Sequence, residues 1–132
     1  MTLPETWDPS SAARAALLAV GIYHLGFALF HLGFWKIFRW KEELARLGHV
    51  NRAIMQVLNV CFTYLAFAFA LLAFAFPHSL GDAVLGVLAG LWLLRAALQV
   101  VYFRRVGARI NAALVALFLV GAALPLAAIV AR

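Results

Sequence analysis

Charged residues, and acidic residues above all, are scarce in this sequence. Of its 132 residues only 12% are charged, with 5 Asp and Glu against 11 Lys and Arg, whereas 67% are hydrophobic. A soluble domain has about 25% charged and about 45–50% apolar residues. The composition therefore excludes an ordinary soluble domain and predicts a protein of the lipid bilayer. Because the basic residues cluster between apolar runs, membrane topology explains them, and we expect no nucleic-acid partner.

Cysteine is also scarce, and no arrangement of side chains typical of catalysis is visible. The single cysteine, Cys61, excludes an internal disulfide and a cysteine metal cluster. No nucleophile beside a base, no catalytic pair of carboxylates and no metal-binding cluster of carboxylates and histidines can be recognised. Enzymatic activity is therefore less favoured than binding or transport, and no metal site is expected.

Four apolar runs are long enough to cross a bilayer, which takes about 20 residues of α-helix. They cover about residues 12–37, 51–76, 82–103 and 110–130. None shows the sustained alternation of polar and apolar residues that marks a strand. We therefore predict an all-α protein, with residues 1–132 forming a single domain folded as a four-transmembrane-helix bundle. Between the first two runs, Trp40, Leu44 and Leu47 share a helical face, which predicts a short interfacial helix.

The basic residues predict an orientation in the membrane. Most of them lie in or beside the first and third connections, namely Lys36, Arg39, Lys41, Arg46, Arg52, Arg104, Arg105 and Arg109. The second connection, residues 77–81, has none. Since Lys and Arg collect in cytoplasmic loops, we expect the first and third connections in the cytoplasm and both termini on the periplasmic side.

Two stretches of the first half carry a resemblance to known proteins. They read FHLGFWKIFRW over residues 30–40 and NRAIMQVLN over residues 51–59, and the pattern WLLRAALQ over residues 92–99 extends the similarity. The chain resembles a group of small, uncharacterised four-helix proteins of the bacterial inner membrane. The resemblance implies a bacterial source, an inner-membrane location and the same architecture, but it implies no activity, cofactor or catalytic residue.

Polar residues within the apolar runs recur at helical spacings of three and four, so each set forms one stripe of a helix. The stripes are Arg52, Gln56, Asn59 and Thr63 in the second run; Trp92, Arg95, Gln99 and Tyr102 in the third; and His24 and His31 in the first, with Asn111 added by the fourth. At about 1.5 Å per residue, most of these positions fall in the predicted cytoplasmic half of the membrane.

Arg95 is the most informative of these residues. An arginine at the centre of a spanning helix costs about 2.5–3.5 kcal/mol on insertion scales. No Asp or Glu lies in an apolar run except Asp82, at the far end of the third. We therefore predict a cationic pocket for an anionic or polar group, formed by Arg95, His31, Gln56, Asn59 and Gln99, with His24 deeper. The alternative is that these side chains only join helices through hydrogen bonds, worth about 0.6 kcal/mol each.

The histidines also suggest a haem hypothesis. Two axial histidines normally come from facing helices, but His24 and His31 lie on one face of one helix and cannot both bind the same iron. A haem would need histidines from two subunits or one unusual ligand. No cofactor is expected, and haem or quinone stays an alternative.

Small residues lie opposite the polar stripes. Gly26 and Gly33 lie on the first run, and Gly86 and Gly90 on the third. Such faces permit close approach of helices. A helix with one polar and one small face is expected to be covered on both sides, which predicts a homo-oligomer or a partner membrane protein.

Three functions stay open on these observations. The leading one is a small transporter, channel-like or ligand-binding membrane protein whose cationic pocket holds a small anion, a substrate carboxylate, a lipid headgroup or a quinone carbonyl. The second is a structural or accessory subunit whose polar cluster fixes helix packing. The third is a redox subunit with haem or quinone.

Overall fold

Four long helices dominate the computed structural model, which describes residues 9–105 and 107–132. They are α1 (Ser11–Leu32), α4 (His49–Ala75), α5 (Asp82–Tyr102) and α6 (Ala108–Val130). All four are long and apolar enough to cross a membrane, at 22, 27, 21 and 23 residues. No strand occurs in the described part of the chain. The predicted all-α fold with four long apolar helices is confirmed.

The first helix is shorter than predicted, because the chain bends at Gly33. The amide of this glycine donates to the carbonyls of both Leu29 and Phe30, which closes the last turn of α1. The remainder of the apolar run forms a separate short helix, α2 (Phe34–Ile37). The prediction of one continuous helix over residues 12–37 is therefore wrong at its end.

A short helix does lie between α1 and α4, as predicted. The chain turns at Arg39, whose φ of 51° is left-handed, into α3 (Trp40–Glu43) and the 3-10 turn η1 (Leu44–Arg46). On the predicted apolar face Trp40 and Leu44 are buried, whereas Leu47 is exposed. At the opposite end, the 3-10 turn η2 (Pro77–Ser79) connects α4 to α5.

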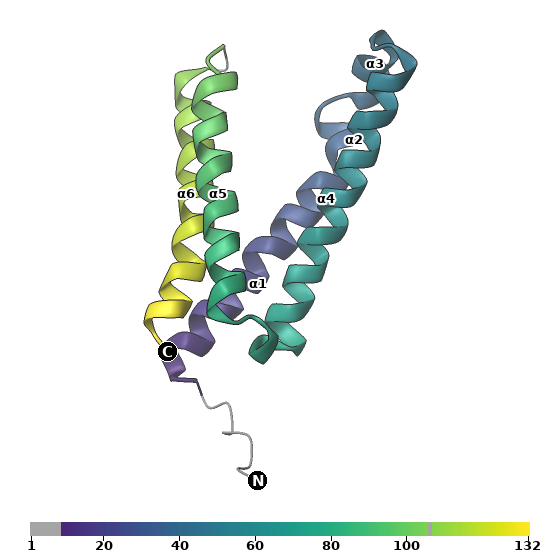
Figure 1. The fold of residues 1–132 in the computed structure, drawn as a ribbon. Helices are drawn as coiled ribbons and strands as arrows, with labels where there is room; N and C mark the ends of the chain where they lie inside the picture. Colours follow the sequence, from purple (N-terminus) through teal and green to yellow (C-terminus); the bar gives the residue numbers. More distant parts are fainter. Residues whose placement is uncertain (1–8, 106) are drawn as a thin grey trace.

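The long helices form two antiparallel pairs. α1 packs against α4, α5 packs against α6, and contacts between α1 and α6 join the pairs. Figure 1 shows the pairs close together near the chain termini and diverging towards α3 and the α5–α6 connection. The arrangement is therefore an open bundle, in which α4 runs apart from α5 and α6 at the end that carries α3.

Two layers of side chains hold the pairs together. The layer nearer the termini consists of small and aliphatic residues: Leu17, Val20, Ala73, Leu80, Leu85, Leu88 and Ala128. The next is an aromatic layer with one ring from each long helix: Phe27, Phe62, Trp92 and Phe118. Within it the ring centroids of Phe27 and Trp92 are 4.6 Å apart. Beyond this aromatic layer the pairs separate (Figure 1).

Polar contacts close the narrow end of the molecule. The Ser10 hydroxyl caps α1 by accepting from the Ala13 amide and donates to the carbonyl of Ala131, at 2.5 Å. Arg132 pairs with Asp82, with Nη1 2.7 Å from the carboxylate oxygen, and also donates to the Leu80 carbonyl. These contacts attach the end of α6 to the starts of α1 and α5.

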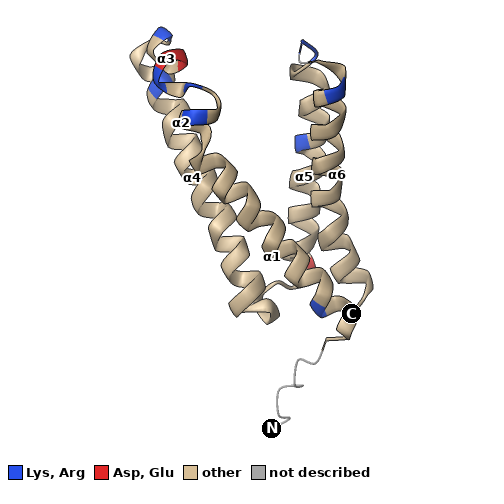
Figure 2. Ribbon diagram, turned by 180° about the vertical axis from the view of Figure 1, so that it is seen from behind, with Lys and Arg blue, Asp and Glu red and all other residues tan. Residues whose placement is uncertain are grey.

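Positive charge gathers at the wide end of the molecule. Figure 2 shows most of the Lys and Arg segments near α3 and at the α5–α6 connection, on both helix pairs. The narrow end holds Arg14 and Arg132, and Asp82 lies near the latter. The α1–α4 and α5–α6 connections, which were predicted to be cytoplasmic, lie at the same end of the molecule, because the two antiparallel helices α4 and α5 separate them.

Candidate functional site

Two of the predicted site residues, His31 and Arg95, lie just beyond the aromatic layer, towards the wide end of the molecule. His31 is one turn past Phe27 on the same face of α1, and Arg95 is three residues past Trp92 on α5. The rings of Phe27 and Trp92 are in contact, with centroids 4.6 Å apart, so the residues about one turn beyond them lie in the same part of the bundle. The two residues therefore belong to one region, although they project from different helix pairs.

His31 and Asn59 form a reciprocal pair between α1 and α4. Nδ1 of His31 lies 2.8 Å from Oδ1 of Asn59, and Nδ2 of Asn59 donates to the His31 carbonyl at 3.2 Å. A carbonyl oxygen only accepts, so the Asn59 nitrogen must face it and Oδ1 must face the ring. Nδ1 of His31 therefore carries a hydrogen, and in the neutral ring Nε2 is the acceptor.

The plane of the His31 ring is set by its aromatic neighbours. The ring stacks on Phe34 of α2 with centroids 4.3 Å apart and an interplanar angle of 23°, and Phe62 of α4 lies 4.6 Å away. Nε2 makes no hydrogen bond within the described residues and is not enclosed by the protein. The imidazole is thus oriented, with one nitrogen satisfied and the other free.

Arg95 starts a chain of hydrogen bonds that links α5 to α6. Its Nη1 donates to Oε1 of Gln99 at 2.9 Å, and Nε2 of Gln99 donates to Oδ1 of Asn111 at 2.9 Å. Because a guanidinium can only donate, the direction of both bonds is determined. Gln99 is fully buried, so its side chain is a rigid support for Arg95.

Two aromatic rings flank the guanidinium of Arg95. Its central carbon lies 4.3 Å from the ring centroid of Phe118 and 5.4 Å from that of Phe103. An arginine over an aromatic face is stabilised by about 0.5–2 kcal/mol, depending on how far it is desolvated. Only one of its five donors has a partner in the described part of the protein. Arg95 is therefore held in place with most of its hydrogen-bonding capacity unused.

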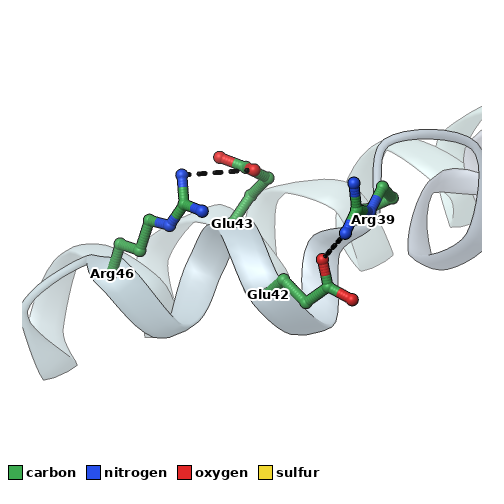
Figure 3. Close-up of polar contacts among 4 residues, drawn as sticks. All are labelled: Arg39, Glu42, Glu43 and Arg46. Carbon is green, nitrogen blue, oxygen red and sulfur yellow. Dashed lines mark hydrogen bonds and ion pairs between the residues drawn. The ribbon is translucent and has the colours of Figure 1, made fainter.

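The acidic residues near the wide end do not neutralise Arg95. Glu42 pairs with Arg39, and Glu43 lies 3.5 Å from Arg46, each within the α3–η1 segment (Figure 3). All four side chains are largely exposed. Arg95 therefore has no carboxylate partner among the described residues, and its charge remains available to an anion.

His24, which was predicted to lie deeper in the pocket, has both ring nitrogens bound within the protein. It is 2% exposed, with Nδ1 2.8 Å from the Val20 carbonyl and Nε2 accepting from Trp92 Nε1 at 3.2 Å. Both ring nitrogens are thereby satisfied within the protein. Its geometry is that of a link between α1 and α5, on the narrow side of His31.

Two members of the predicted stripe on α4, Gln56 and Arg52, make no hydrogen bond to the other predicted site residues in the described structure. Gln56 makes no side-chain hydrogen bond in the described structure and borders a cavity of about 220 Å³ with Val57, Val60 and Cys61. Arg52 donates through Nη2 to the carbonyls of Ala45 and Leu47, and so binds the start of α4 to the preceding segment. Thr63, which lies on the same stripe one turn beyond Asn59, donates to the Asn59 carbonyl within the helix.

The predicted single polar cluster is therefore divided between the helix pairs. His31 and Asn59 form one half, and Arg95, Gln99 and Asn111 form the other. No hydrogen bond joins the halves within the described residues, and Gln56 belongs to neither. We name these five residues the inter-pair site.

Three hydrogen bonds in or near the site were not predicted from the sequence. Asn111 was placed near the site by its position at the start of the fourth run, but its bond to Gln99 needs the exact phase of α6. The Trp92 donation to His24 and the Tyr23 donation to the Leu117 carbonyl, at 2.9 Å, were missed. The sequence signal for these two bonds was only an amphipathic aromatic side chain in an apolar run, which needs a partner when buried.

Comparison with known proteins provides no relative for this arrangement: no family model, curated protein or solved structure matches the chain.

Proposed function

We propose that the protein is a multi-pass protein of the bacterial inner membrane, with the α1–α4 and α5–α6 connections in the cytoplasm and both termini in the periplasm. Four helices long and apolar enough to span a bilayer support this proposal. So does the concentration of Lys and Arg at one end of the helices (Figure 2).

We propose further that the inter-pair site binds the anionic group of a ligand within the membrane. The observation that carries this proposal is the state of Arg95, which is held by Gln99 and Phe118 but has four donors without a partner among the described residues. Such a charge in an apolar medium is costly unless an anion, water or the membrane surface compensates it. Arginine in a transmembrane helix is by default a candidate functional residue.

The surroundings favour an anion that carries an apolar part. The aromatic layer bounds the inter-pair site on one side, and Phe34 and Phe103 flank its polar groups. Few polar side chains are present to replace the hydration shell of a small ion. An amphiphile with an anionic headgroup leaves its apolar part in contact with aromatic rings and lipid, so we favour this class over a hydrated inorganic ion.

Transport is the wider form of the same proposal. The helix pairs are close at the narrow end and diverge at the end predicted to be cytoplasmic (Figure 1). A binding site between two helix units that can rock against each other is the arrangement by which alternating access operates. Binding is required in either form, so binding is the property to measure first.

The decisive test compares the purified protein with its Arg95→Leu variant. The probe is phosphatidylmethanol, a lipid with a negative charge and no headgroup hydroxyl, and binding is counted by native mass spectrometry. Arg104→Leu, which removes an exposed charge of the α5–α6 connection, is the matched control. We expect binding in the wild type and the control, and its loss in Arg95→Leu. Equal binding by all three proteins would refute the proposed site.

A structural role is the second candidate for part of the polar set. His24 and Gln99 are buried and have their hydrogen bonds satisfied by other helices. This is the behaviour of residues that join helices in a membrane bundle. If Arg95→Leu lowers stability and changes no binding, the whole cluster has this role.

A redox role rests on His31 alone. Its Nδ1–H is bound by Asn59 and its Nε2 is free, which resembles the way a metal-binding histidine is oriented by its neighbours. Both ring nitrogens of His24 are bound within the protein, so His24 and His31 do not together offer two ligands to a haem. A visible spectrum of the purified protein tests this alternative: a Soret band lost in His31→Phe would establish it.

A further inference from the structure

The chemistry of the inter-pair site is asymmetric, and Nε2 of His31 is the origin of the asymmetry. The Asn59 amide is held by the His31 carbonyl, so its oxygen must take the Nδ1 hydrogen. In the neutral imidazole this leaves a lone pair on Nε2. The stacking of the ring on Phe34 keeps the lone pair in a defined direction.

Arg95 presents the opposite chemistry. Its free guanidinium positions can only donate, and they seek an anionic or carbonyl oxygen. Arg95 and His31 each lie about one turn beyond a ring of the aromatic layer, Trp92 and Phe27, whose centroids are 4.6 Å apart, so the donors and the acceptor border the same region between the helix pairs. A ligand that offers only acceptor oxygens satisfies Arg95 but leaves Nε2 of His31 without a hydrogen bond.

We propose that the ligand of the inter-pair site carries a hydroxyl group beside its anionic group, with the anionic oxygen on Arg95 and the hydroxyl donating to Nε2 of His31. This inference rests on the proposed function, because it assumes that Arg95 binds the anion. It identifies the ligand class as a hydroxyl-bearing anion, for which a phosphate ester of glycerol is the simplest representative. The same chemistry occurs in a lipid headgroup and in a free, water-soluble phosphate ester.

The test compares two anionic lipids that differ in the headgroup alcohol, which is glycerol in one and methanol in the other. Phosphatidylglycerol and phosphatidylmethanol have the same charge and the same acyl chains, but only the first has a headgroup hydroxyl. We expect the wild type to bind phosphatidylglycerol more tightly by roughly two- to tenfold, the effect of one hydrogen bond. His31→Phe should bind both lipids equally, at the affinity that the wild type shows for phosphatidylmethanol.

Two further variants make the comparison robust. In Asn59→Leu the imidazole remains but Nδ1–H is released, so the preference for phosphatidylglycerol should shrink while both lipids still bind. This variant keeps the test valid if His31→Phe fails to fold. His49→Phe, at the exposed histidine that begins α4, is the matched control and should keep the full preference.

The outcomes separate this inference from the proposed function. If Arg95→Leu abolishes binding of both lipids but the wild type shows no preference, the hydroxyl inference is wrong and the anion site stands. The hydroxyl inference is equally wrong if the preference survives in His31→Phe, or if phosphatidylmethanol binds more tightly than phosphatidylglycerol to the wild type. If Arg95→Leu binds both lipids as the wild type does, the proposed function itself fails.

Soluble esters identify the source of the ligand. Glycerol 3-phosphate and methyl phosphate are added as competitors against bound phosphatidylglycerol. Displacement by glycerol 3-phosphate at lower concentration than by methyl phosphate would support the hydroxyl inference and assign a water-soluble ligand. Failure of both to displace the lipid, together with the lipid preference above, would support the inference and assign a lipid headgroup. Displacement by methyl phosphate at the lower concentration would overturn the inference.

Discussion

The indole N–H of Trp92 in α5 donates to Nε2 of His24 in α1, with the two nitrogens 3.2 Å apart. The other nitrogen of His24 faces the Val20 carbonyl, so the ring is a neutral imidazole whose hydrogen is on Nδ1. His31, seven residues later, has the same tautomer but a free Nε2. The two histidines of α1 therefore differ in their contacts: both ring nitrogens of His24 are bound and its Nε2 joins the helix pairs, whereas Nε2 of His31 has no partner among the described residues.

Replacing the two histidines should separate these roles. His24→Phe leaves the Trp92 N–H buried without an acceptor, which costs about 1–3 kcal/mol of folding free energy. His31→Phe replaces a partly exposed ring between two other aromatic rings and should change stability by less. Thermal unfolding in detergent measures both. A double-mutant cycle with Trp92→Phe isolates the bond; a coupling energy near zero would contradict the assignment.

Gln99→Glu should weaken anion binding without unfolding the protein. The new carboxylate would lie where Oε1 now accepts from Arg95 at 2.9 Å, so the arginine would be neutralised from within. We expect the affinity for phosphatidylmethanol to fall by about tenfold or more, the range for hydrogen bonds to a charged group. Gln99→Leu, which leaves the charge unpaired, should reduce affinity less. Unchanged affinity in Gln99→Glu would show that Arg95 does not bind the anion.

Arg95→Lys should also impair binding, although it preserves the charge. An ammonium group cannot reproduce the planar fork that donates to Gln99 and lies over the Phe118 ring at the same time. We expect an affinity between those of the wild type and Arg95→Leu, measured with the same lipid. Full affinity in Arg95→Lys would mean that charge alone matters and that the oriented guanidinium does not.

The surroundings of each glycine predict whether a larger side chain can be accommodated there. A Cβ at Gly121 would overlap the Tyr23 side chain, which is fixed by its bond to the Leu117 carbonyl and by contact with Trp92. Gly121→Ala should therefore destabilise the protein by about 1–3 kcal/mol through overpacking. Gly86→Ala is the control, because a Cβ there meets open space. Equal thermal stability of both variants would contradict the packing of α6 on α1.

Self-association is predicted to use the small residues that the single chain leaves uncovered. A Cβ at Gly26 or Gly86 would meet open space, whereas a Cβ at Gly33 would meet Ile37 and the Phe30 carbonyl. The side chain of Ile37 lies beside Gly33, so Gly26 and Gly86 are the positions at which this prediction is tested. We expect Gly26→Leu or Gly86→Leu to shift a crosslinked oligomer towards monomer. A native chain that runs as a monomer in several detergents would defeat this prediction.

The proposed orientation is open to a direct test. A reporter that is active only in the periplasm should be active when fused after Arg132 and inactive when inserted at Gly107, in the basic α5–α6 connection. The physical reason is the retention of Lys and Arg in the cytoplasm. The reverse pattern would overturn the proposed topology, while leaving the geometry of the inter-pair site unchanged.

The pairing of His31 with Asn59 shows how far the sequence could predict the site. Both residues lie on polar stripes at matching depth, so their proximity followed from helix geometry. The bond from Arg95 to Gln99 was also accessible, because residues four apart on a helix are neighbours. The division of these polar residues between two helix pairs could not be predicted from the sequence, because periodicity describes the faces of one helix at a time.

The sequence by itself determined the four long apolar helices, the segment between the first two and the clustering of basic residues at one end. These features depend on hydrophobic run length and local charge, which are properties of contiguous residues. Only the tertiary structure decided that the pairs diverge, that His24 is closed by Trp92 while His31 stays open, and that Gln56 lies outside the site. The reason is that these features depend on the mutual rotation of helices, which the packing of Phe27, Phe62, Trp92 and Phe118 sets across the whole bundle.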